Sequence, residues 1–65
     1  MNSEFDSAID RAWDELDLLE QNIVNLEAEL NATKGAKARE WLQKKLAEAR
    51  AKREEKSEYL KGFYQ

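Results

Sequence analysis

The sequence predicts an all-α protein, an antiparallel two-helix hairpin of the coiled-coil type that dimerises into a four-helix bundle. Three observations predict this fold. Apolar residues recur at heptad spacing in the first half, the spacing breaks near a glycine in the middle, and the two halves carry opposite charge. With 65 residues and no proline, the chain forms one domain, residues 1–65.

The first helix is expected over about residues 3–33. Its apolar positions follow one another at intervals of four and three residues for nearly four heptads. They are Phe5, Ile9, Ala12, Leu16, Leu19, Ile23, Leu26 and Leu30. Ser3 is a suitable N-cap, and Glu4 and Asp6 in the first turn complement the helix dipole. The eight apolar residues together form one apolar seam along the helix.

A turn is expected at about residues 34–36, because the heptad pattern does not continue there. The next seam positions would be the polar residues Thr33, Lys37, Glu40 and Lys44. Gly35 lies at the break and is the candidate for a left-handed residue that ends the first helix.

The second helix is expected over about residues 36–62, which are rich in the helix formers Ala, Lys, Glu, Leu and Arg. Its new seam runs through Leu42, Leu46, Ala49, Leu60 and Phe63. Arg53 and Lys56 interrupt this seam. We expect their methylene stems to cover the apolar strip while their charged ends reach water near Glu15. The alternative is that these cations receive an acidic group from a partner.

A register test favours the hairpin over two long bent helices in parallel. In an antiparallel pair, the numbers of facing residues add up to a constant. They do so for Leu26 with Leu42, Leu19 with Ala49, and Phe5 with Phe63, and nearly so for Ile23 with Leu46 and Ile9 with Leu60. In this register Glu20 is expected opposite Arg50, and Glu15 opposite Lys52.

The two halves differ strongly in charge. Residues 1–33 carry nine acids and one base, whereas residues 34–65 carry ten bases and five acids. This asymmetry indicates complementary helices, although each exposed pair contributes only a few tenths of a kcal/mol.

Large apolar residues outside the seam predict self-association or docking onto a larger protein. They are Trp13, Leu18, Val24, Trp41, Tyr59 and Tyr64. A chain of this size has little core of its own, and exposed Trp and Tyr are enriched where proteins meet. The simplest outcome is a two-fold homodimer. The alternative is that Trp13 and Trp41 lie half-buried along the hairpin edge.

A row of aspartates gives a second hypothesis, that of an acidic decoy for a DNA- or RNA-handling enzyme. The row consists of Asp6, Asp10, Asp14 and Asp17. Carboxylates at this helical spacing could imitate nucleic-acid phosphates. The alternative is a solvated outer face. We expect no metal site, because no loop wraps these acids around an ion.

A basic face on the second helix gives a third hypothesis, direct binding of RNA or DNA. Its candidates are Lys37, Lys44, Lys45 and Lys52. Protein binding is favoured over nucleic-acid binding, because acids interrupt this face and the net charge is −3.

The composition predicts a non-catalytic protein without a cofactor. There is no histidine or cysteine to act as a base, nucleophile or ligand, and no glycine-rich loop for phosphate. Because no signal peptide or membrane span is present, we expect a cytoplasmic protein that does not bind membranes.

The expected function is therefore a protein-protein interaction module, such as an adaptor, an assembly subunit or an inhibitor. The chain resembles small antiparallel helical hairpins that dimerise into bundles, in shape and length only. No motif identifies a family, so no functional residue is assigned from this resemblance.

Overall fold

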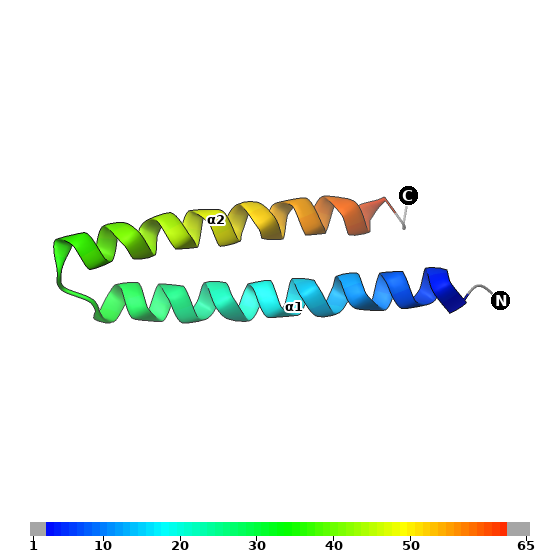
Figure 1. The fold of residues 1–65 in the computed structure, drawn as a ribbon, viewed down its shortest axis with the longest axis horizontal. Coiled ribbons are helices and arrows are strands. Elements are labelled where there is room, and N and C mark those ends of the chain that lie inside the picture. Colours follow the sequence, from blue (N-terminus) through cyan, green and yellow to red (C-terminus); the bar gives the residue numbers. More distant parts are fainter. Residues whose placement is uncertain (1–2, 63–65) are drawn as a thin grey trace.

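The computed structural model describes the backbone of residues 3–62 and the side chains of residues 7–62. It contains two helices, α1 (Ser3–Ala32) and α2 (Ala36–Lys61). The helices run side by side in opposite directions, with the turn at one end (Figure 1). The predicted all-α hairpin is confirmed. Its dimensions of 53 × 16 × 13 Å correspond to a rod that is a single layer of helices thick.

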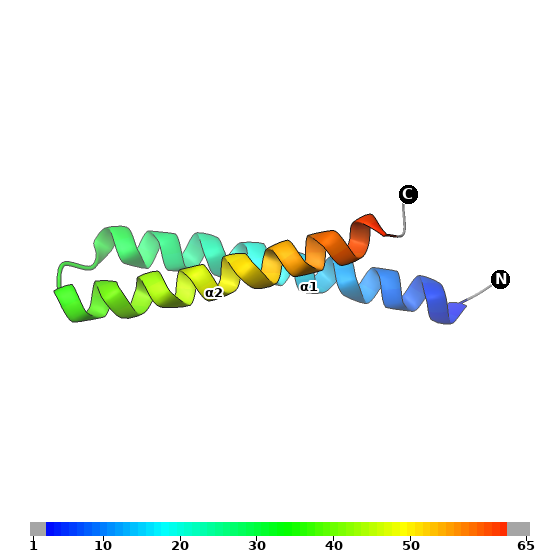
Figure 2. The ribbon, with the colours of Figure 1, turned by 90° about the horizontal axis from the view of Figure 1, so that it is seen from above.

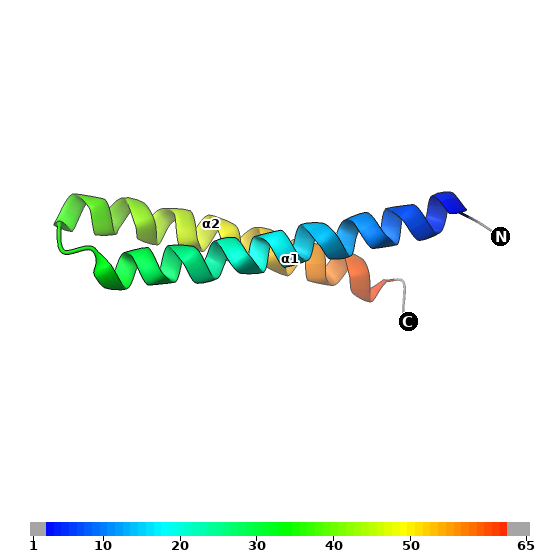
Figure 3. The same ribbon diagram turned by 90° about the horizontal axis from the view of Figure 1, so that it is seen from below.

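The two helices cross near their middle, as the views from above and below show (Figures 2 and 3). A shallow crossing is typical of helices that pack through heptad-spaced residues. It keeps the seam of each helix against its neighbour.

The core follows the predicted seam. Every seam position with a described side chain is buried or half-buried. Six of the seven buried residues of the described part form two clusters, one of Ala12, Leu16 and Leu60 and one of Ile23, Leu46 and Ala49, against which Leu26 and Leu30 pack. The predicted contact of Phe5 with Phe63 involves side chains outside the described residues.

Arg53 and Lys56 occupy the α2 seam positions between Ala49 and Leu60, which belong to different clusters. Both cations are half-buried, and the Lys56 ammonium forms an ion pair with the Glu15 carboxylate. This placement supports the expectation that their stems cover the apolar strip while their charged ends reach outward.

The structure corrects the prediction for the turn. The first helix ends at Ala32, one residue before the expected Thr33. Gly35 is not left-handed: its φ of −69° and ψ of 131° are extended, and it is the N-cap residue of α2. No described residue has a positive φ.

Side chains donate to two carbonyl groups in the last turn of α1, those of Glu29 and Leu30, which lessens the need for a left-handed glycine there. Arg39 on α2 donates from Nη1 to the carbonyl oxygens of Leu30 at 2.6 Å and of Thr33 at 3.0 Å. The Thr33 hydroxyl donates to the carbonyl oxygen of Glu29 at 2.6 Å. These hydrogen bonds give partners to carbonyl oxygens that have no amide donor within the helix.

The predicted ion pairs between the helices were wrong in their partners. Arg50 pairs with Glu27 at 2.8 Å rather than with Glu20, and Glu15 pairs with Lys56 rather than with Lys52. Helical side chains lean toward the N-terminus of their own helix. In an antiparallel hairpin the two leans point in opposite directions along the rod. Two charged ends that meet therefore belong to residues whose numbers add up to more than those of residues directly opposite each other.

Candidate functional site

The predicted apolar residues outside the seam are exposed. Those with described side chains are 43 to 65% exposed, namely Trp13, Leu18, Val24, Trp41 and Tyr59. Tyr64 lies outside the described residues. Single exposed apolar residues are common on proteins, so the arrangement of these five decides whether they form a surface.

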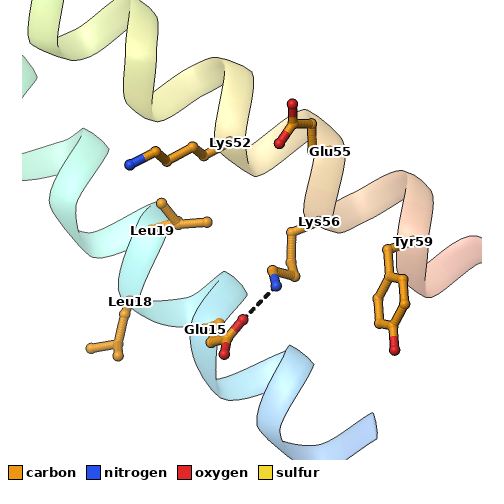
Figure 4. Close-up of a pocket in the computed structure, with 7 residues that line it drawn as sticks. All are labelled: Glu15, Leu18, Leu19, Lys52, Glu55, Lys56 and Tyr59. Carbon is orange, nitrogen blue, oxygen red and sulfur yellow. Dashed lines mark ion pairs between the residues drawn. The ribbon is translucent and has the colours of Figure 1, made fainter. Parts of the chain in front are cut away.

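Three of the five lie along one groove between the helices. One hollow of about 550 Å³ is lined by Glu15, Leu18, Leu19, Lys52, Glu55, Lys56 and Tyr59 (Figure 4). A second hollow is lined by Leu19, Asn22, Leu26, Trp41, Lys45, Glu48, Ala49 and Lys52. The two share Leu19 and Lys52, so they adjoin each other and together make one groove along this side of the hairpin. We call it the Trp41–Tyr59 groove.

The floor of the Trp41–Tyr59 groove is aliphatic and its rim is charged. Leu19 is half-buried where the two hollows meet, and Leu18 beside it is 65% exposed. Lys52 and Glu55 line the α2 side (Figure 4). An apolar floor within a polar rim is typical of surfaces that bind protein.

Each aromatic ring of the groove makes a cation–π contact with a lysine of α2. The Lys45 ammonium lies 5.6 Å from the centre of the Trp41 ring and 3.5 Å from the Glu48 carboxylate. The Lys56 ammonium lies 5.9 Å from the centre of the Tyr59 ring. Cation–π contacts of this kind orient exposed rings and so prepare them for contact with another molecule.

Lys56 also acts on Glu15 at the same end of the groove. The hydrogen bond from the Lys56 ammonium and its positive charge hold the pKa of the Glu15 carboxyl below its ordinary value. Glu15 therefore stays ionised at neutral pH and links α1 to α2 there.

Trp13 and Val24 lie on another side of α1. Val24 is turned by only about 20° around the helix from Trp13, whereas Leu18 is turned by about 140° from it. Neither residue lines the Trp41–Tyr59 groove. The predicted partner-binding residues thus fall on two faces instead of one.

The predicted acidic face is exposed at Asp10, Asp14 and Asp17, and the Asp6 side chain lies outside the described residues. The ion pairs described between the helices use Glu15 and Glu27 instead. The role of this row as a decoy stays a prediction.

The predicted basic residues do not form a uniform patch. Lys45 and Lys52 line the Trp41–Tyr59 groove, where they alternate with Glu48 and Glu55. Lys37 and Lys44 are exposed and lie outside this groove. Binding of RNA or DNA through this helix stays a prediction.

The role of Arg39 was not predicted from the sequence. This residue joins the end of α1 to the start of α2 but falls in a polar stretch outside the expected apolar seam. A signal was present, since continuing the second seam backward from Leu46 and Leu42 reaches Arg39. Its half-buried position agrees with this spacing.

Within residues 3–62 the structure offers neither a membrane-spanning helix nor a cluster of metal ligands. No helix there is long and apolar enough to span a membrane. No cluster of three or more acidic side chains among the described residues could hold a metal ion.

No family model matches the chain, and no match was found to a curated protein or to a solved structure.

Proposed function

We propose that this chain is a non-catalytic protein-protein interaction module that acts by helix packing and self-association. The observation that carries the proposal is the Trp41–Tyr59 groove. It presents two oriented aromatic rings and an aliphatic floor on a rod with only one layer of helices. A second layer packed on this face would complete a four-helix bundle.

The exposed area supports association. A compact monomer of 7.6 kDa is expected to expose about 4,300 Å². The hairpin exposes 5220 Å², an excess of about 900 Å². A rod with a single layer of helices leaves this additional area exposed, and a second layer packed on it would cover part of it.

The core gives a second reason. The buried apolar residues of the described part are small in number and include two alanines; they are Ala12, Leu16, Ile23, Leu42, Leu46, Ala49 and Leu60. Chains of this size that lack disulfides and metals gain stability by oligomerising. Association therefore supplies the apolar burial that one hairpin lacks.

The test is the mass of the full chain by light scattering over a range of micromolar concentrations. We expect a dimer that dissociates on dilution. The substitution Trp41→Ala should weaken the dimer while helical circular dichroism remains. The matched control Lys37→Ala changes an exposed α2 residue outside the groove and should have no effect. A folded monomer at every concentration would refute the proposal.

A further inference from the structure

Eight α2 residues line the Trp41–Tyr59 groove, and two of them, Ala49 and Lys56, belong to the seam. The other six form a row with a symmetric pattern. In chain order they are Trp41, Lys45, Glu48, Lys52, Glu55 and Tyr59. The classes are aromatic, cation, anion, cation, anion and aromatic. Read backward, aromatic residues fall on aromatic positions, and every charge falls on a position of the opposite sign.

The spacing of the row is symmetric as well. Successive members are separated by four, three, four, three and four residues, so they follow one side of a helix and are symmetric about position 50. The small residues Ala38 and Gly62 extend the pattern by three residues at each end. A row of this kind is complementary to a second copy of itself that runs the opposite way.

We propose that the occupant of the Trp41–Tyr59 groove is a second copy of this chain, turned end for end by a two-fold axis beside position 50 of α2. The α2 helices of the two copies then lie antiparallel. This inference rests on the self-association proposed above and adds the face and the orientation.

Charge complementarity in this arrangement follows directly from the row. Lys45 of each copy faces Glu55 of the other, and Glu48 faces Lys52. Trp41 faces Tyr59. Because an interface with two-fold symmetry repeats each contact, every pair forms twice.

Aliphatic residues of α1 lie near the same axis. Leu19 and Lys52 line both hollows of the groove, so Leu19 marks its middle. Leu18, which is 65% exposed, lies beside it. The second copy would cover both leucines with its own, which places aliphatic contact between the α1 helices beside the charged pairs of the α2 row.

The same row disfavours parallel α2 helices. In that case Lys45 would face Lys45, and Glu48 would face Glu48, along the whole row. Facing like charges are destabilising on helices. The pattern therefore selects the antiparallel orientation.

The experiment uses two single charge reversals, Lys45→Glu and Glu55→Lys, in the full chain. Each variant alone places like charges opposite each other at two equivalent positions. We expect each to have a dimer dissociation constant at least about tenfold weaker than the native chain. In an equimolar mixture, Glu at position 45 of one variant faces Lys at position 55 of the other, so dimers should reappear.

The double variant, with both reversals in one chain, should also regain native affinity. Lys44→Glu is the matched control, because it makes the same charge change next to Lys45 but outside the groove. It should dimerise like the native chain. Helical circular dichroism checks that each single variant is folded.

The outcomes separate the two proposals. A native chain that is monomeric overturns both of them. A native dimer whose mass and affinity are unaffected by either reversal, or variants that stay dissociated when mixed, would overturn only the antiparallel α2 arrangement.

Discussion

The Lys56 side chain contributes both to the packing between the helices and to the surface of the groove. Its stem occupies a core position on α2, while its ammonium pairs with Glu15 and lies over the Tyr59 ring. The sequence predicted that this charged end would lie near Glu15. It could not predict the pairing of Arg50 with Glu27, because that contact depends on how both side chains lean along their helices.

Glu15 should make the stability of the hairpin depend on pH. Because the pKa of Glu15 is lower in the folded chain than its ordinary value of 4.5, its ionisation favours folding. This contribution is fully present above the ordinary value and is lost as the pH falls through the lowered one. The native chain should therefore melt at a higher temperature than Glu15→Gln at neutral pH, and the two should converge in acid.

The measurement is the thermal midpoint at a fixed protein concentration between about pH 7 and about pH 2. Glu20→Gln is the control, since Glu20 is exposed on the same helix and is not part of the described ion pairs. A difference between the native chain and Glu15→Gln that persists unchanged at low pH would contradict the role of the Lys56 pair.

At the scale of the helices, heptad spacing predicted both elements and their seams, because burial of a periodic apolar stripe depends on local order in the sequence. The helix end was not predictable in the same way. Gly35 suggested a left-handed cap, but Arg39 closes the end of α1 from the other helix. That contact joins residues nine positions apart and requires the bend between the helices to be formed.

The N-terminus of α2 is open to improvement by a cap. Gly35 provides no side-chain hydrogen bond, and the first turn of α2 contains no acid. A Cβ at Gly35 would lie 3.9 Å from the Cβ of Ala38, which is ordinary contact. Gly35→Asp should therefore raise the free energy of unfolding by about 1 kcal/mol over Gly35→Ala, because Asp caps a helix and Ala does not.

Urea denaturation of the two variants at equal protein concentration measures this difference. The comparison with Gly35→Ala removes the effect of losing glycine flexibility, which both variants share. Equal stability of the two variants would show that residue 35 does not act as the N-cap.

At the scale of the whole molecule, the sequence predicted the hairpin but not how its surface is divided. Off-seam residues were expected to act together. The structure places Leu18, Trp41 and Tyr59 along one groove, whereas Trp13 and Val24 lie elsewhere. The face of the hairpin on which an off-seam residue lies depends on how the two helices pair. The residue pattern of a single helix does not contain this information.

Self-association should make thermal unfolding depend on concentration. If the folded chain is a dimer and the unfolded chain is a monomer, mass action raises the melting temperature as protein is added. We expect calorimetry or circular dichroism to show this rise between micromolar and millimolar concentration. Trp41→Ala should reduce the slope, and Lys37→Ala should not. A melting temperature independent of concentration would contradict association of the folded state.

The clasp of Arg39 on the carbonyl groups of Leu30 and Thr33 has a consequence for the order of folding. It joins residues close in the sequence, next to the cluster of Ile23, Leu46 and Ala49. Closing a short loop costs less entropy than closing a long one. Contacts between the helices should therefore form first at the bend and then progressively toward the chain termini. Such a topology, dominated by local contacts, is expected to fold rapidly.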